Sequence, residues 1–108
     1  MSKGFEGMGN FLKQAQEIQS RLAQVQEEVG RRTVEASAGG GMVKVEVNGQ
    51  FVLSSVRIDP AVIQPQEKEM LEDLVQAAVN EGLRKAREMV SEEMSKVTGG
   101  LKIPGMMP

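Results

Sequence analysis

The first third of the chain carries a hydrophobic stripe at helical spacing. Between Met8 and Val29 an apolar residue recurs every three or four positions, the spacing that gathers side chains on one face of an α-helix. The stripe lasts for three heptads, as in helices that pack against a partner helix. We predict a helix from Met8 to Val29, with Asn10 as its candidate N-cap and Gly30 as its C-cap. The stripe comprises Met8, Phe11, Ala15, Ile18, Leu22, Val25 and Val29.

The middle of the chain alternates apolar and polar residues, as a strand with one buried face does. Three such segments follow one another, "RRTVEASA", "MVKVEVN" and "QFVLSSVRI". The last two are joined by Asn48-Gly49, a dipeptide that favours a two-residue hairpin turn because both residues tolerate a positive φ. Such a turn pairs Val45 with Val52. We therefore predict a three-stranded antiparallel sheet over residues 31–58.

The two faces of this predicted sheet differ in character. Valines line one face and form the predicted core. Phe51 and Leu53 lie on the other face among charged residues, and exposed apolar side chains on such a face mark a contact surface. We predict that a second subunit covers it, with Phe51 and Leu53 as candidate dimer-interface residues. The valine face comprises Val43, Val45, Val47, Val52, Val56 and Ile58, and the other face Lys44, Glu46, Phe51, Leu53 and Arg57.

A run of three glycines, Gly39 to Gly41, precedes the second strand. A phosphate-binding loop places its glycines between a strand and a helix, so that backbone N–H groups and the helix dipole meet at the anion. Here the glycines lead into a strand, and neither Gly-Lys-Ser nor Gly-Lys-Thr follows them. We therefore interpret the run as a turn between two strands.

A second helix begins after the sheet. Asp59-Pro60 ends the last strand, and Pro65 marks the entry to another apolar stripe. A helix over residues 66–97 is about 48 Å long at the usual helical rise, which is longer than a sheet of short strands covers. Its outer end should project, or pack on the first helix or on another subunit. The stripe comprises Leu71, Leu74, Val75, Ala78, Gly82, Ala86, Met89, Val90, Val97 and one charged residue, Glu93.

These elements predict an α+β fold of a long helix, a three-stranded antiparallel sheet and a second long helix, in one domain of 108 residues. We expect an ordered core over about residues 7–98 and a flexible tail over residues 99–108, which are rich in Gly and Pro. A domain of this size buries only part of its surface, so a partner subunit would add stability. Two apolar stripes and two partly apolar sheet faces also need more cover than one copy offers. Both arguments predict a homodimer.

The composition removes most catalytic and metal-binding chemistry. The chain has no His and no Cys, which are the usual proton shuttle, nucleophile and soft metal ligands. Carboxylates in "EKEMLED" and "SEEM" remain, but charges of both signs in such runs are typical of a solvated helix face. No segment has the length and apolarity of a membrane span, and the N-terminus lacks the apolar core of a signal peptide. We expect a cytoplasmic protein that is not an enzyme and takes no cofactor, metal or small-molecule substrate.

Four blocks of the sequence, taken in order, resemble a known family. They are "GMGNFLKQAQEIQ", "GGGMVKVEVNG", "VRIDP" and "EKEMLEDLVQAAVNEG", and the similarity runs from about Gly7 into the C-terminal tail. In this order they resemble the YbaB/EbfC family of bacterial nucleoid-associated proteins, which bind DNA. The resemblance implies a cytoplasmic homodimer that is associated with the nucleoid and binds double-stranded DNA without a cofactor. It further implies a dimer whose sheets form the body and whose paired helices project as a clamp.

The net charge of −2 argues against strong DNA binding, because Lys and Arg supply most of that affinity. Local basic clusters, doubled by the symmetry of a dimer, are the alternative source. Few phosphate contacts and no base-reading motif predict weak, salt-sensitive and largely sequence-independent binding. The candidate DNA-binding residues are Lys13 and Arg21 on the first helix, Arg31 and Arg32 at its end, and Arg84, Lys85 and Arg87 on the second helix.

These basic residues have a second interpretation, as partners in ordinary surface ion pairs. Glu81 and Glu88 lie at helical spacing from Arg84, and Glu17 lies at that spacing from Lys13. An alternative function also stays open, that of a helical-arm scaffold or chaperone-like module that grips protein. The eight methionines suit an irregular apolar partner surface. A mobility-shift assay with duplex DNA over a salt series separates the two functions.

Overall fold

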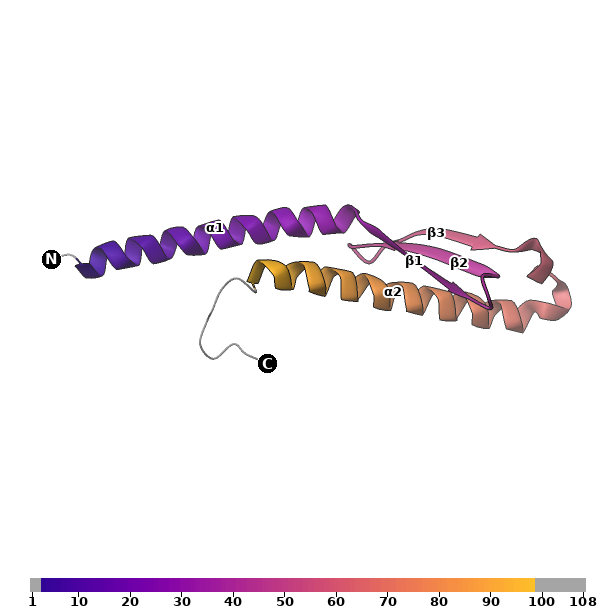
Figure 1. Cartoon of the computed structure of the whole chain (residues 1–108). Coiled ribbons are helices and arrows are strands. Elements are labelled where there is room, and N and C mark those ends of the chain that lie inside the picture. The colour runs from indigo at the N-terminus through magenta and orange to yellow at the C-terminus, as the bar shows by residue number, and fades with distance from the viewer. Residues whose placement is uncertain (1–2, 99–108) are drawn as a thin grey trace.

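The computed structural model describes residues 3–98 as two long helices joined by a three-stranded sheet (Figure 1). The molecule is elongated, with extents of 80 × 25 × 16 Å. This confirms the α+β order expected from the sequence, while the predicted flexible tail, residues 99–108, lies outside the described residues. In chain order the elements are α1 (Lys3–Arg31), β1 (Thr33–Ala38), β2 (Val43–Asn48), β3 (Leu53–Ile58), two short 3-10 helices (Pro60–Val62 and Pro65–Glu67) and α2 (Lys68–Thr98).

The three strands form an antiparallel sheet in the order β1-β2-β3. β1 pairs with β2 so that Ala36 lies opposite Val45. In the turn between these strands, Gly39 to Gly41 have φ values of 63°, 67° and 98°, in the left-handed region that glycine adopts without strain. The glycine run is therefore the turn between two strands that the sequence predicts.

The pairing of β2 with β3 differs from the predicted register. Val45 lies opposite Val56, and Val43 lies opposite Ile58, so the pairing of Val45 with Val52 was a wrong prediction. The shift from position 52 to position 56 is an even number of residues, and an even shift leaves each side chain on its face. Val43, Val45 and Ile58 therefore still share one face of the sheet, as the alternation of the sequence indicates.

The loop between β2 and β3 explains the shifted register. The side-chain oxygen of Asn48 accepts hydrogen bonds from the backbone N–H groups of Gln50 at 2.8 Å and of Val52 at 3.1 Å. The backbone N–H of Phe51 donates to the Asn48 carbonyl at 3.0 Å, and Phe51 itself takes a φ of 63°. Asn48 thus closes a wider loop over residues 49–52. The dipeptide Asn48-Gly49 begins this loop but does not form a tight turn alone.

Phe51 and Leu53 do not share the outer face that the sequence assigns to them. Leu53 lies opposite Val47 across the ladder, and opposite residues of an antiparallel pair point to the same face, here the valine face. Phe51 belongs to the loop before β3. The cause is a bulge between Glu46 and Val47, because an extra residue in one strand interrupts its alternation. Both side chains are nevertheless exposed.

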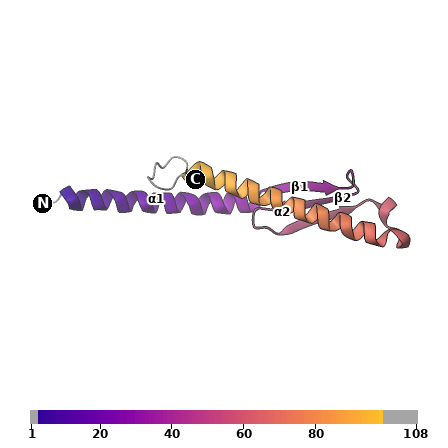
Figure 2. The same cartoon turned by 90° about the horizontal axis from the view of Figure 1, so that it is seen from below.

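α2 packs lengthwise on the valine face, over β1 and β2 (Figure 2). Val45 and Val47 are buried beneath it together with Ala78 and Ala86 of the helix. Gly82 allows this close approach, since a Cβ in its place would lie 2.8 Å from Val47 and 3.1 Å from Val45, and interiors are too densely packed to absorb it freely. The apolar stripe of the second helix is therefore confirmed as its core-facing side.

α1 leaves the sheet and projects away from it (Figures 1 and 2). Its last turns pack on the C-terminal part of α2 (Figure 1), with Val29 and Gly30 buried. Of the outcomes expected for the outer end of the second helix, packing on the first helix is the one observed. Towards its N-terminus α1 extends past the end of α2 (Figure 1), and Phe11 is 70% exposed there. We call residues 7–21 of α1 the arm.

The ends of α1 differ from the predicted caps. The helix begins at Lys3, so Asn10 lies inside it and is not its N-cap. It continues through Gly30 to Arg31, so Gly30 is not its C-cap either. Gly30 serves packing instead, because a Cβ in its place would lie 3.2 Å from the Gln50 side chain. The predicted start was late because residues 3–7 include two glycines and show no apolar period.

Candidate nucleic-acid interface

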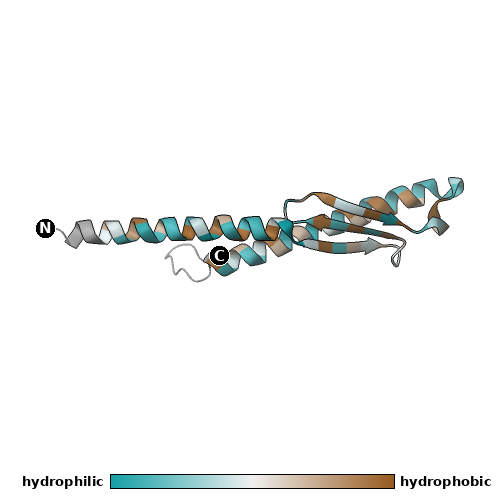
Figure 3. Ribbon diagram, turned by 90° about the horizontal axis from the view of Figure 1, so that it is seen from above, coloured by the Kyte–Doolittle hydropathy of each residue, from teal (hydrophilic) through white to brown (hydrophobic). Residues whose placement is uncertain are grey.

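The arm presents two basic residues without an internal partner. Lys13 and Arg21 are both exposed. Helical spacing puts Lys13 opposite the apolar stripe of α1 and Arg21 at its flank, and the arm as a whole is largely hydrophilic (Figure 3). Together with Gln16, Glu17 and Ser20 they line an open groove along the helix. Among the described residues neither Lys13 nor Arg21 forms an ion pair. Ammonium, guanidinium, amide and hydroxyl groups all donate hydrogen bonds to phosphate oxygens.

Arg84 is held between two carboxylates of its own helix. Its Nη2 lies 2.7 Å from Glu81 Oε1, and its Nη1 lies 2.9 Å from Glu88 Oε2. The hydrogen bond from Arg84 lowers the pKa of Glu81, and its bonds to Glu81 and the charge of Glu88 raise the pKa of Arg84. The group carries two negative charges for one positive charge. Arg84 is therefore an ion-pair partner in the free protein, and a phosphate would have to displace its carboxylates.

Lys85 and Arg87 are close to Arg84 in sequence but have different surroundings. Lys85 Nζ donates a hydrogen bond to the backbone carbonyl of Glu35 at 3.1 Å, which ties α2 to the β1 strand. Arg87 is exposed, and it has no ion-pair partner within residues 3–98. Of the three basic candidates on α2, Arg87 is thus the most open to a phosphate.

The two arginines at the end of α1 are both engaged. Arg31 Nη2 lies 3.3 Å from Glu27 Oε1 on the exposed side of the helix. Arg32 Nη1 lies 2.9 Å from Glu93 Oε1 on α2, and Lys96 Nζ meets the same oxygen at 3.1 Å. Hydrogen bonds from Lys96 and Arg32 lower the pKa of Glu93. Arg32 therefore joins two helices within the chain rather than standing free.

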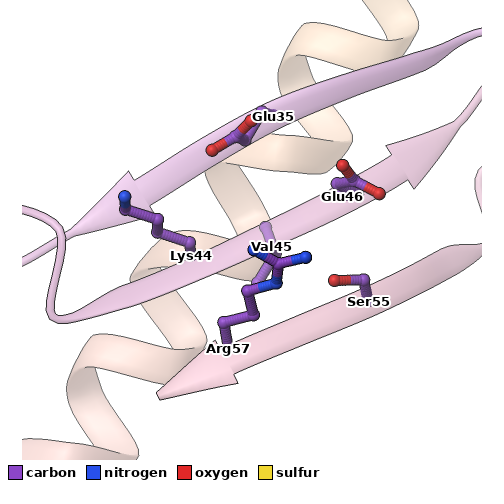
Figure 4. Close-up of a pocket in the computed structure, with 6 residues that line it drawn as sticks. All are labelled: Glu35, Lys44, Val45, Glu46, Ser55 and Arg57. Atoms are coloured by element: carbon purple, nitrogen blue, oxygen red, sulfur yellow. The ribbon is translucent and has the colours of Figure 1, made fainter. Parts of the chain in front are cut away.

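The outer face of the sheet carries a charged cluster that the sequence did not assign to binding (Figure 4). The register places Lys44 opposite Arg57 and Glu35 opposite Glu46, and these side chains surround a hollow of about 70 Å³. Two acidic and two basic groups cancel in charge, so the cluster has little net attraction for a phosphate. Arg57 lies beside Lys44 because of the β2–β3 register. The register predicted from the sequence was wrong, so the cluster could not be found from the sequence.

Comparison with known proteins identifies the family. A profile of the YbaB/EbfC DNA-binding family matches residues 3–101. The chain belongs to this family. A nucleoid-associated protein of Syntrophobacter fumaroxidans is 52% identical over 106 residues, which cover 98% of this chain and 93% of that protein. Another, of Moorella thermoacetica, is 54% identical over 102 residues, which cover 92% of this chain and 98% of that protein.

A solved structure supports the fold of this YbaB/EbfC protein. The crystal structure of the uncharacterized protein HP0035 from Helicobacter pylori superimposes with a TM-score of 0.61 at 24% sequence identity, over 72% of this chain and 90% of that chain. The family profile and the two relatives confirm the resemblance seen in the four sequence blocks, and a DNA-binding family is not an enzyme class. Across residues 3–98 no group of three or more acidic side chains is placed to hold a metal ion. Neither helix in that range combines the length and apolarity needed to cross a membrane.

Proposed function

We propose that this protein is a homodimeric, nucleoid-associated protein that binds double-stranded DNA in the cytoplasm, with little sequence specificity. In this role it affects the organisation of the nucleoid or the expression of genes. The family is a DNA-binding family, and two relatives with at least 52% identity are named nucleoid-associated proteins. Those matches cover at least 92% of either chain, which supports a common function for the whole length.

The arm is the observation that supports this proposal most directly. It projects as a helix beyond the rest of the described chain (Figure 1) and carries Lys13 and Arg21 free of internal ion pairs over residues 3–98. Such groups neutralise phosphates and release counterions whatever the base sequence is. A projecting helix also reaches a duplex while the acidic remainder of the molecule stays at a distance. We therefore place the main DNA contact on the arm, with Arg87 as a further contact from α2.

The other basic candidates need an exchange of partners before they contact DNA. Arg31 and Arg84 are paired with carboxylates of their own helices, and Arg32 with Glu93. Exposed ion pairs are weak and exchange readily, so a phosphate can replace a carboxylate at Arg31 or Arg84. Lys85 is the least available to a phosphate, because its ammonium group donates a hydrogen bond to the backbone of β1.

We place the second subunit on the β3 side of the sheet. α2 covers β1 and β2, while Leu53 and Val56 of β3 remain 40% and 42% exposed. Phe51 and Val52, in the loop before β3, are exposed as well. Apolar side chains gathered at one side of a domain are typical of a contact surface. A two-fold contact through this side would bury these apolar side chains of both copies. It would also double the number of basic residues available to one duplex.

A mobility-shift assay with several unrelated duplexes over a salt series tests the proposal. The wild-type protein should bind all duplexes with similar affinity and lose affinity as salt rises. Lys13→Ala/Arg21→Ala should weaken binding and lower the salt slope by roughly one unit for each phosphate that the variant no longer neutralises. The control Lys44→Ala/Arg57→Ala removes the same charge from the outer face of the sheet and should bind nearly as the wild type does.

Failure of the wild-type protein to bind any duplex at low salt would overturn the DNA-binding proposal. A protein-gripping function of the helical arms would then be the remaining alternative. Equal reductions of affinity in the two double variants would instead show that only the total charge matters, and would remove the arm as the specific contact.

A further inference from the structure

The helix that carries the arm, α1, is connected to the sheet along the chain through a single residue. α1 ends at Arg31 and β1 begins at Thr33, so Arg32 alone joins helix to strand. Its backbone N–H donates to the Val29 carbonyl at 3.0 Å, and its own carbonyl accepts from the Gly49 N–H at 3.0 Å. α1 has 29 residues and is therefore about 43 Å long. A small change at this joint swings the far end of a helix of that length through many ångströms.

The β2–β3 loop closes against the joint from one side. A Cβ at Gly49 would overlap the carbonyl oxygen of Val29 and lie 3.0 Å from the Cα of Gly30. Both obstacles are backbone atoms of α1, which cannot rotate away as the end of a side chain can. Gly49 therefore allows the loop to touch the end of the helix, and a larger residue forces the loop and the helix apart.

Glu93 closes the joint from the side of α2. It is the one charged residue on the apolar stripe of that helix, and its side chain is only 23% exposed. Its Oε1 lies 2.9 Å from Arg32 Nη1 and 3.1 Å from Lys96 Nζ. Placing a charge among apolar positions is unfavourable unless it is paired. The pair with Arg32 therefore accounts for an acidic residue at this position.

We infer that Gly49 and Glu93 are positioning residues that hold the arm at a fixed angle to the sheet. The inference rests on the proposed DNA-binding function, because the angle of the arm decides where Lys13 stands relative to a duplex. In a dimer, two arms grip one duplex together only when their spacing matches it, and the second contact then forms at a high effective concentration. An arm that swings freely loses this advantage while it keeps all of its charges.

A direct phosphate contact by Arg32 is the competing role, and the two roles predict opposite effects of Glu93→Gln. If Arg32 contacts phosphate, the substitution frees its guanidinium and removes a negative charge, so DNA binding becomes stronger. If Glu93 positions the arm, the substitution loosens the joint and DNA binding becomes weaker despite the removal of a negative charge. Arg32→Gln weakens binding in both cases. The sign of the change in Glu93→Gln therefore decides between them.

The affinity for one duplex at fixed salt is compared in Glu93→Gln and Glu92→Gln. Glu92 is exposed and forms no ion pair in the described part of the chain, so its substitution controls for the change in charge alone. Glu93→Gln should bind DNA about three- to tenfold more weakly than Glu92→Gln, while the two variants keep the same oligomeric state. Equal or tighter binding overturns the inference. A wild-type protein that does not bind overturns the proposed function instead.

The geometry of the arm gives a readout that needs no DNA. The chain has no cysteine, so Gln14→Cys on the arm and Ser37→Cys on β1 provide the only two sites for spin labels. Dilution with unlabelled protein keeps the measured distance within one chain. Glu93→Gln should broaden the distance distribution of these labels relative to Glu92→Gln, at an equal thermal midpoint. Gly49→Ala should shift the distribution, and if it fails to fold, the size-matched Glu93→Gln variant carries the test. An unchanged distribution in Glu93→Gln overturns the inference.

Discussion

The body of the molecule, which is the sheet with α2 packed on it, differs from the arm in where its apolar and basic side chains lie. In the body, Val45 and Val47 of the sheet are buried against Ala78 of α2, and this close packing holds the elements together. In the arm, Phe11 and Leu12 are among the most exposed apolar residues of the described chain, while its basic residues are free of internal ion pairs over residues 3–98. The stability of the fold therefore depends on the body, and the surface of the arm can change without loss of the fold.

The largest effect is expected from placing the same charge in each region. Val45→Asp should destabilise the fold by more than about 4 kcal/mol, because it buries an unpaired carboxylate in the core. Phe11→Asp should change the free energy of unfolding by less than about 0.5 kcal/mol, because the side chain already faces water. Thermal unfolding followed by circular dichroism measures both. A large destabilisation by Phe11→Asp would instead show that Phe11 is buried in the assembled protein, with a second subunit covering the arm.

The β3 side tests whether the body continues into a dimer interface. Leu53→Glu should weaken association by more than about tenfold, because it places a carboxylate in the centre of an apolar contact. Ser37→Glu, at an exposed position of the opposite edge strand β1, should leave association unchanged. Sedimentation equilibrium measures both variants. Unchanged association in Leu53→Glu would remove the β3 side from the interface, and a folded wild-type monomer at micromolar concentration would remove the dimer.

The two long helices can be compared as sources of DNA affinity. Lys13→Ala/Arg21→Ala should lower the salt slope by roughly two units per subunit engaged, because both cations are free. Arg84→Ala/Arg87→Ala should lower it by roughly one unit, because Arg84 is already neutralised by its carboxylates. Titration of one duplex at several salt concentrations gives both slopes. The reverse order of the two slopes would move the main contact from the arm to α2.

The smallest effect is expected from pH. Hydrogen bonds from Lys96 and Arg32 lower the pKa of Glu93 in the folded protein below the ordinary value of 4.5. The stabilisation that ionised Glu93 gives to the joint is therefore complete above its ordinary pKa, and it is lost as the pH falls through the lowered pKa of the folded protein. The label distances of the wild type should broaden over this acidic range towards those of Glu93→Gln. An equally large response in Glu93→Gln would assign the effect to other carboxylates.

Local patterns in the sequence were sufficient to predict the elements. The two helices, the three strands and the turn at Gly39 to Gly41 all depend on the spacing of neighbouring residues, so they could be found without a structure. Local patterns did not give the helix boundaries, because a favourable N-cap residue such as Asn10 does not begin a helix when the residues before it already form helical hydrogen bonds. The predicted register of β3 was wrong because the side chain of Asn48 closes a wider loop than a two-residue turn.

The candidate site was predictable only as a set of basic residues. Nothing in the local pattern separates Arg32 from Arg21, since both are exposed arginines near acidic residues. Arg32 is engaged because Glu93, far away in the chain, lies beside it in the fold. Lys85 is engaged in the same way by a backbone carbonyl of β1. Free and occupied cations can be told apart only when distant segments are placed together.

Spacing along the chain sets which segments are helix or strand and which side of each is apolar, so these properties can be predicted from the residues alone. Three features follow only from the folded chain: the pairing of Leu53 with Val47, the approach of Gly49 to the end of α1, and the ion pair of Arg32 with Glu93. The pairing depends on how the loop after β2 closes, and the other two depend on atoms that come together across long separations in sequence. The closeness of such atoms is set by the packing of whole elements, which no local pattern encodes.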